Sequence, residues 1–150
     1  METITLNTGR SDFRLIHRIL EVAPQTMTGV YTFSNDPDYL GLESLAQLCA
    51  MHVRYLVDFR EHAFLLKIRH FLSMTPKPLH GPYHLRATLL SQGGRAYAYT
   101  SELMKENVAT YTGGFLIATK PYDHRFREAS LKTHYAQVFS CLRNDIKTGS

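Results

Sequence analysis

The sequence predicts an α+β fold, in which a curved antiparallel sheet wraps one long central helix and an extra C-terminal helix follows. Three observations support this fold class. Apolar residues recur at helical spacing over residues 39–58, which predicts one long helix. Segments rich in β-branched and aromatic residues lie on both sides of that helix and predict strands. Two strands before the helix and four after it are typical of a helix packed on a sheet.

The chain before the central helix predicts one hairpin. Residues Phe13 to Val22 alternate loosely between apolar and polar types, and Thr26 to Phe33 are rich in β-branched and aromatic residues. We therefore expect these two segments to pair as strands. Ser34 to Asp38 form a dense turn before the helix, and we expect Asp36 or Asp38 to cap its first turn.

Four strands and a terminal helix are expected after the central helix. The strands are Ala63 to Met74, Tyr83 to Ser91, Ala96 to Lys105 and Asn107 to Lys120. Turn residues separate them, with Gln92 to Arg95 before the third strand and Lys105 to Asn107 before the fourth. Gly113 and Gly114 within the last strand predict a bulge or a close approach of another group. Residues Glu128 to Asn144 carry apolar residues at helical spacing and predict an amphipathic helix.

The composition fits one folded domain over residues 1–150, with its core over about residues 13–120 and the C-terminal helix over about 128–144. A chain of 150 residues has the length of a single domain. The hydrophobic fraction of 44% excludes a disordered chain. The apolar runs are too short for a membrane span, and the N-terminus lacks the pattern of a signal peptide, so we expect a cytoplasmic protein.

The formal net charge of +4 is scattered along the chain and forms no basic run. This distribution argues against nucleic acid as a partner, because it provides neither a phosphate-binding stripe nor an aromatic platform. A modest positive rim instead suits an acidic acyl carrier protein or the phosphates of coenzyme A. His80 and His84 are four residues apart, but Pro82 between them rules out a regular helix, so we expect neither a metal nor another cofactor.

Glu43 marks the one segment in which the sequence suggests chemistry. It interrupts the apolar segment LGLESLAQL, at the border of a stripe formed by Leu42, Leu45, Ala46, Cys49, Ala50, Val53, Leu56 and Val57. Gln47 and Arg54 share its face of the helix, which could line a groove beside the core. Desolvation there would raise the carboxyl pKa toward the range useful for proton transfer. The alternative is a solvated glutamate on the rim of the helix, capped or paired with Arg54.

The motif LGLESLAQ and the order of elements resemble the hotdog fold, and most closely the 3-hydroxyacyl-acyl carrier protein dehydratases of fatty-acid synthesis. That family carries its catalytic acid in a helix motif similar to LGL(E/D)xxxQ. The segments FRLIHRILEV and IRHFLSMTPKPLHGPYHL also resemble the family, so the likeness covers about residues 13–120. It implies Glu43 as catalytic acid or base, with the family's glutamine at Gln47. It also implies that backbone N–H groups near Asp38 and Tyr39 bind the substrate by polarising a thioester carbonyl.

The chain departs from this family in the loop before the helix. The dehydratases place a histidine there, in a His-Phe-Pro-Gly motif, whereas this chain has the shorter segment SNDPDY without histidine. Other histidines remain as alternatives that could approach Glu43 from another strand or from a twin subunit, namely His17, His70, His80 and His84.

The resemblance leaves three functions open. The first is a dehydratase-like protein acting on acyl-carrier-protein or coenzyme A thioesters, in fatty-acid or related lipid or polyene biosynthesis. The second is a hotdog thioesterase, because some members use a helix-borne glutamate alone and need no loop histidine. The third is a non-catalytic acyl-binding scaffold subunit. A homodimer or a multiple of it is implied in each case, because the acyl tunnel of hotdog proteins runs along a subunit interface.

Overall fold

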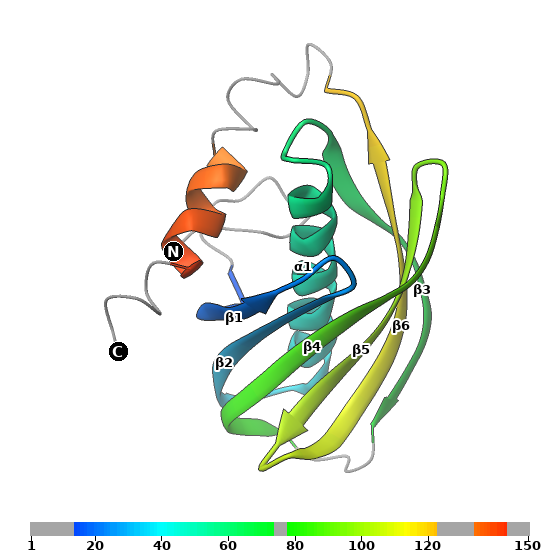
Figure 1. The fold of residues 1–150 in the computed structure, drawn as a ribbon. Helices are drawn as coiled ribbons and strands as arrows, with labels where there is room; N and C mark the ends of the chain where they lie inside the picture. Colours follow the sequence, from blue (N-terminus) through cyan, green and yellow to red (C-terminus); the bar gives the residue numbers. More distant parts are fainter. Residues whose placement is uncertain (1–13, 74–77, 123–133, 144–150) are drawn as a thin grey trace.

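A computed structural model of the protein describes residues 14–73, 78–122 and 134–143. These residues form six strands and one long helix, and residues 134–143 add a shorter helix (Figure 1). The elements are β1 (Arg18–Val22), β2 (Thr26–Asp36), α1 (Asp38–Leu56), β3 (His62–Ser73), β4 (Leu79–Gly93), β5 (Ala96–Lys105) and β6 (Val108–Lys120). Within the described ranges, no helix is both long enough and apolar enough to cross a membrane.

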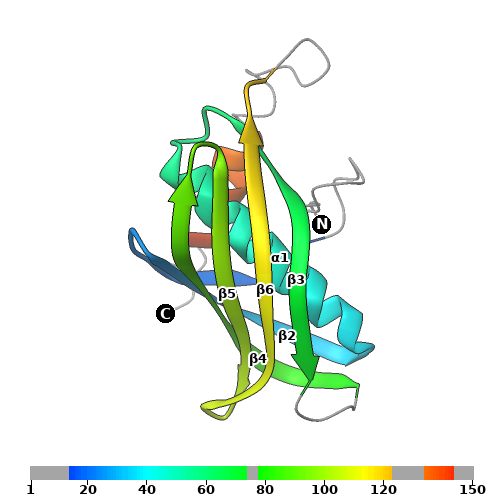
Figure 2. The same cartoon turned by 90° about the vertical axis from the view of Figure 1, so that its right-hand side faces the viewer.

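All six strands form one antiparallel sheet in the order β1-β2-β4-β5-β6-β3. The strand that follows α1 therefore lies at the opposite edge from β1. The sheet curves around α1, and Figure 2 shows the strands crossing in front of the helix. This arrangement, with the second helix at residues 134–143, confirms the predicted α+β fold class.

The hairpin turns are formed by residues with positive φ. Glu106 and Asn107 connect β5 to β6 with φ of 53° and 68°, and Gly94 lies between β4 and β5 with φ of 58°. Left-handed residues of this kind match the twist of tight hairpins. Two positions of β6 require glycine because other side chains approach them closely. A Cβ on Gly114 would lie 2.5 Å from the His70 ring, and one on Gly113 would lie 2.8 Å from the Phe115 ring. The close approach predicted at this pair is confirmed.

The start of α1 differs from the prediction. Pro37 is the N-cap residue, with φ of −65°, and no side chain caps the helix. Asp38 is already helical, and the Asp36 carboxylate accepts a hydrogen bond from the Ser34 N–H at 2.9 Å. The prediction that Asp36 or Asp38 caps the helix is therefore wrong. The physical reason is that Asn35, with φ of 56°, turns the end of β2 so that the Asp36 carboxylate is used within the strand.

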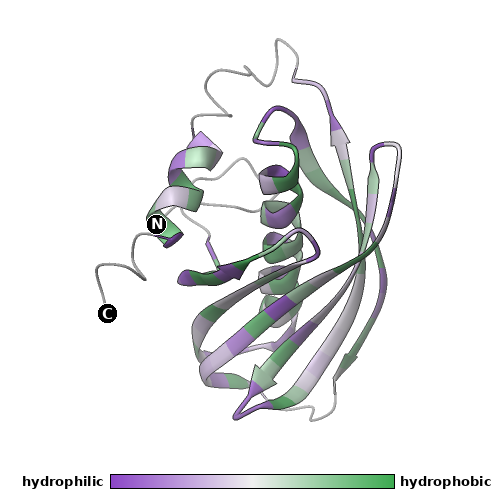
Figure 3. Cartoon of the chain, in the orientation of Figure 1, coloured by the Kyte–Doolittle hydropathy of each residue, from purple (hydrophilic) through white to green (hydrophobic). Residues whose placement is uncertain are grey.

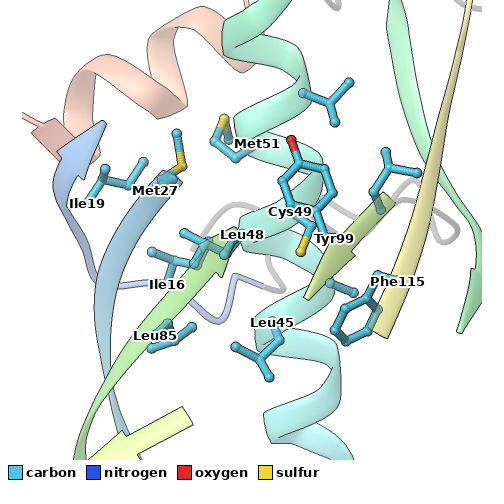
Figure 4. Packing of buried hydrophobic residues seen from close by; sticks show 14 of the residues in the cluster. Ile16, Ile19, Met27, Leu45, Leu48, Cys49, Met51, Leu85, Tyr99 and Phe115 are labelled. Atoms are coloured by element: carbon cyan, nitrogen blue, oxygen red, sulfur yellow. The ribbon is translucent and has the colours of Figure 1, made fainter. Parts of the chain in front are cut away.

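The predicted one-sided apolar stripe describes only part of the burial of α1. Every residue from Ser44 to Arg54 is buried. One side of the helix packs on the sheet, where Leu45 and Tyr99 belong to the hydrophobic core (Figure 4). The other side is covered by the segment before β1 and by the helix at residues 134–143. The sequence period could not reveal this second layer, because its residues are far from α1 in the chain.

Hydropathy follows this layering. Apolar and polar residues alternate along much of β4 and β5, so one face of the sheet meets α1 while the other meets solvent (Figure 3). Apolar residues of α1, β2 and β4 gather between the helix and the sheet, among them Leu48, Met27 and Leu85 (Figure 4). The core therefore lies on the concave side of the sheet and fixes α1 in place.

Two polar side chains of α1 are hydrogen-bonded within this core. Cys49 Sγ lies 3.0 Å from Ser101 Oγ. His52 Nε2 lies 2.8 Å from the Ala23 carbonyl, and its Nδ1 lies 2.7 Å from the Tyr99 hydroxyl. Because a carbonyl only accepts, Nε2 carries the proton and Tyr99 donates to Nδ1. Burial lowers the pKa of His52, and the bond to Ala23 partly opposes this effect, so the imidazole is held neutral.

We expect His52 to make the protein less stable as the pH falls below about 6.5, which is the ordinary pKa of a histidine. The folded pKa lies below the unfolded one, so the unfolded chain binds the proton more readily. The stabilisation is complete above the unfolded pKa and is lost as the pH falls toward the folded pKa, by at most about 1.4 kcal/mol per pH unit. Urea unfolding on both sides of pH 6.5 should show a smaller pH slope for His52→Gln than for the wild type. Equal slopes in the wild type and in His52→Gln would contradict the assignment.

Candidate functional site

Three residues one turn apart form a face of α1 that leads from solvent into the protein. Tyr39 is 64% exposed, Glu43 is half-buried, and Gln47 is 1% exposed. Residues four apart lie above one another on a helix. Glu43 therefore sits where this face passes from the surface into the interior, so its carboxyl is partly withdrawn from water.

The inner end of this face is fixed to the segment that precedes β1. The Gln47 Oε1 accepts a hydrogen bond from the Leu15 N–H at 2.8 Å, and the Ser44 hydroxyl donates to the Leu15 carbonyl at 2.6 Å. Both backbone groups of this buried residue are thus satisfied by side chains of α1. We call this pair of hydrogen bonds the Leu15 clamp. Ser44 was missed from the sequence, because a serine within a helix gives no sign of a partner 29 residues away.

The environment of Glu43 acts on its carboxyl in two opposing ways. Burial raises the carboxyl pKa above its ordinary value, and a hydrogen bond from the Gln47 side chain lowers it. Because the Gln47 carbonyl accepts from Leu15, its amide nitrogen is the group that donates to the carboxylate. The result is a carboxyl with a raised pKa whose anionic form still has one fixed donor, which suits a group that transfers protons.

Arg54 lies apart from Glu43, although the helical spacing placed them on one face. It is 11 residues, or about 16 Å, further along the helix. Its guanidinium is fully buried, 3.9 Å from the centre of the Tyr135 ring, and Nη2 donates to the Ala63 carbonyl at 3.2 Å. The alternative pairing of Glu43 with Arg54 is therefore wrong, as is the groove that they were expected to line. The helix at residues 134–143 covers that part of the face.

The loop that would carry a family histidine is reduced to one residue. β2 ends at Asp36 and α1 begins at Asp38, so only Pro37 lies between them. The first turn of α1 has no side-chain cap, and the N–H of Leu40 lies 3.1 Å from the Pro37 carbonyl. The backbone N–H groups of Asp38 and Tyr39, the two residues expected to bind substrate, thus begin the helix one turn before Glu43.

The four alternative histidines make contacts elsewhere. His17 Nδ1 accepts from the Thr32 N–H at 3.1 Å, and burial with nearby Arg14 and Arg18 lowers its pKa. His70 lies over Gly114, and both His80 and His84 are exposed on β4. In the part of the chain that the structure describes, no histidine is hydrogen-bonded to Glu43. The site is therefore centred on one carboxyl with Gln47.

Comparisons with known proteins find similarity in structure rather than in sequence. No protein-family model matches the chain, and no curated protein matches it. Among solved structures, it is similar to the dehydratase heterocomplex ApeI:P from Xenorhabdus doucetiae, with a TM-score of 0.63 and 16% identity over 75% of this chain and 85% of that one. It is also similar to the putative thioesterase yhdA from Lactococcus lactis, with a TM-score of 0.59 and 18% identity over 71% of this chain and 95% of that one.

A third similar structure is the thioesterase HI1161 from Haemophilus influenzae, with a TM-score of 0.61 and 11% identity over 71% of this chain and 80% of that one. At such identities the likeness shows the fold alone. The chain has the hotdog fold that the sequence resemblance implied. Dehydratases and thioesterases are both found among the proteins that share it.

We expect Gln47→Leu to weaken the Leu15 clamp. The variant leaves the buried Leu15 N–H without its acceptor, which should lower the free energy of unfolding by about 1–3 kcal/mol. It should also speed hydrogen exchange at the Leu15 amide, and both effects can be measured by denaturant unfolding and by NMR. Gln25→Leu, at an exposed position, is the control. Unchanged exchange at Leu15 in the Gln47 variant would refute the clamp.

Proposed function

We propose that the protein is a dehydratase of 3-hydroxyacyl thioesters, in which Glu43 transfers the proton and Gln47 positions its carboxyl. The observation that carries this proposal is the half-buried Glu43 carboxyl, with its raised pKa and its hydrogen bond from Gln47. The LGLESLAQ motif resembles the helix motif in which hotdog dehydratases carry their acid and glutamine, and this resemblance supports Glu43 and Gln47 in those roles. Dehydratases and thioesterases of the same fold support an acyl thioester as the substrate class.

One carboxyl can carry out the elimination if it handles both proton transfers. The Glu43 carboxylate takes the α-proton, the C–H electron pair forms the α,β double bond, and the β carbon–oxygen bond breaks. The same carboxyl returns the proton to the departing oxygen, so the products are the enoyl thioester and water. A group that alternately accepts and donates works best with a pKa near the working pH, and burial shifts Glu43 in that direction.

The start of α1 supplies the second element of this mechanism. Negative charge develops on the thioester oxygen as the α-proton leaves, and it needs hydrogen-bond donors. The N–H groups of Asp38 and Tyr39 begin a helix with no side-chain cap, and the helix dipole adds positive charge there. These groups are the proposed donors, with Glu43 one turn away on the same helix. An acyl carrier protein or coenzyme A would present the thioester.

Thioester hydrolysis is the second candidate, and the loss of the histidine loop favours it. With only Pro37 between β2 and α1, the described residues offer no second acid beside Glu43. In hydrolysis, the Glu43 carboxylate takes a proton from water as the oxygen attacks the thioester carbon. The carbon–sulfur bond then breaks, and the proton passes to the leaving thiolate. This route needs only one carboxyl and the same N–H donors.

A second copy of the chain is the proposed partner at the free edge of the sheet. β3 is a 12-residue edge strand, and residues 66–70 are exposed in succession. Its exposed apolar side chains include Leu66, Ile68 and Leu72. Proteins usually cover or blunt an edge of this length, because its unpaired backbone groups invite another strand. Antiparallel pairing of two β3 strands would also place the start of one α1 and the end of the other at the same end of the dimer.

Glu43→Gln is expected to abolish turnover while the protein stays folded. Removing a general acid-base group costs about 10²–10⁴-fold in rate. The folded pKa lies above the ordinary value of 4.5, so ionised Glu43 costs stability as the pH rises, and the variant should be at least as stable as the wild type at neutral pH. Enoyl absorbance and free thiol should be followed together on 3-hydroxyacyl and simple acyl thioesters. Glu102→Gln, which removes the surface partner of Arg86, is the control.

The outcomes of this assay separate the candidates. Enoyl formation that is lost in Glu43→Gln and kept in Glu102→Gln supports the dehydratase. Thiol release with the same dependence on Glu43 assigns hydrolysis instead. Activity that survives in Glu43→Gln refutes both mechanisms, and a folded wild-type protein that is silent in both channels leaves the acyl-binding scaffold.

Ile68→Lys is expected to disrupt the proposed dimer. The exposed Ile68 lies in the middle of β3, where a charge would be buried against its symmetry mate. Light scattering after size exclusion should show a dimer for the wild type and a monomer for this variant. Leu90→Lys, at a 63% exposed apolar position on β4, should remain dimeric. A monomeric wild type would contradict the assembly.

A further inference from the structure

A cavity of about 600 Å³ lies at the C-terminal end of α1, far from Glu43. Its walls come from the last turn of the helix and the residues after it, the tip of the β4–β5 hairpin and the end of β6. Leu56 in this wall is 13 residues, or about 20 Å of helix, beyond Glu43. The volume is in the range of pockets that hold small ligands. The proposed catalytic chemistry makes no use of this cavity.

The charged residues of the cavity leave one positive charge in excess. Arg60, Arg95 and Glu61 line it. The Arg95 Nη2 and the Glu61 Oε2 are 3.4 Å apart, and the arginine side chain is 53% exposed, so this ion pair is weak. Arg60 donates through Nε to the Val57 carbonyl at 3.4 Å. Its two terminal nitrogens have no hydrogen-bond partner among the described residues, so a full guanidinium edge remains for a ligand.

The neutral Tyr97 hydroxyl adds to these donors. The Tyr97 hydroxyl accepts from the Gln92 side chain at 3.3 Å, and its own proton has no acceptor in the described part of the chain. Burial, together with the nearby Glu61 charge, raises the pKa of Tyr97, so the phenol stays protonated and can donate. Thr119 also lines the cavity, and its buried hydroxyl has no hydrogen-bond partner in the described residues.

The helix end does not oppose a negative ligand as strongly as its dipole suggests. A helix C-terminus is normally unfavourable for anions, because its last carbonyls are unpaired. Here three of the last four helix carbonyls, those of Val53, Arg54 and Tyr55, accept hydrogen bonds from backbone N–H groups of residues 57–59. Asp58 and Phe59, with φ of 55° and 59°, fold the chain back to allow these bonds. The arginines therefore dominate the charge in the cavity.

We propose that this cavity is a binding site for a phosphate-bearing organic anion, held by Arg60 and Arg95 with the Tyr97 hydroxyl as a neutral donor. A guanidinium group binds phosphate through two parallel hydrogen bonds to two of its oxygens. A single carboxylate has too few oxygens to accept such a pair of bonds from two arginines at once. A phosphate dianion can displace the one long contact between Arg95 and Glu61. The phosphate belongs either to the carrier of an acyl thioester or to a separate small molecule, and the site does not depend on the activity proposed for Glu43.

Calorimetric titration with inorganic phosphate and pyrophosphate tests the site directly. Loss of a charge-assisted hydrogen bond should weaken binding about tenfold or more in Arg60→Gln and in Arg95→Gln. Arg86→Gln, at an exposed arginine on β4 that pairs with Glu102, is the matched control and should bind as the wild type does. Affinity should also fall as salt is raised. Absence of binding, or equal affinity in all four proteins, would overturn the proposal, as would acetate binding as tightly as phosphate.

Two phosphorylated probes distinguish the sources of the ligand. Tighter binding of coenzyme A than of ATP, lost in the two cavity variants, identifies the thioester carrier. Equal or tighter binding of ATP identifies a separate phosphorylated ligand. Glu43→Gln should bind every probe as the wild type does, because this readout needs no turnover. Failure of the anion site can thus be told apart from failure of the proposed enzyme activity.

Discussion

The double role of Gln47 is the interaction on which the candidate site depends. Its carbonyl accepts from the Leu15 N–H, and its amide donates to the Glu43 carboxyl. The residue is 1% exposed, so water cannot easily replace either partner. Because Leu15 belongs to the layer that covers the outer side of α1, folding of that layer orients the amide, and the amide in turn fixes the carboxyl. The Gln47 side chain therefore both holds the layer over α1 in place and orients the Glu43 carboxyl.

The long central helix separates two different environments. At its start, an uncapped first turn leads to a carboxyl withdrawn from water. At its end, two arginines line a cavity, and three of the last four helix carbonyls accept backbone hydrogen bonds. Between them, every helix residue from Ser44 to Arg54 is buried. An antiparallel dimer through β3 would bring the start of one α1 close to the end of the other. Such a dimer would also explain why β3 is an exposed edge strand.

The sequence predicted local features well and remote ones poorly. Helical spacing located α1, and positive-φ turn residues such as Asn107 separated the late strands, because both signals are local. Glu43 was found because one carboxylate stands out in an apolar helix. The enclosure of α1 was missed because it depends on Leu15 and Tyr135, which are 29 or more residues from their partners Ser44 and Arg54. The cavity was missed for the same reason, since its walls come from three separate segments.

The most direct test of the central claim is a carbon-13 NMR titration of the Glu43 carboxyl in the intact protein. Burial and the Gln47 hydrogen bond are claimed to act in opposite directions, with burial the larger. The pKa should therefore lie above the ordinary value of 4.5 in the wild type and should rise further when Gln47 is replaced by leucine. A pKa at or below 4.5, or one that does not respond to loss of Gln47, would contradict the account of Glu43 as a buried group prepared for proton transfer.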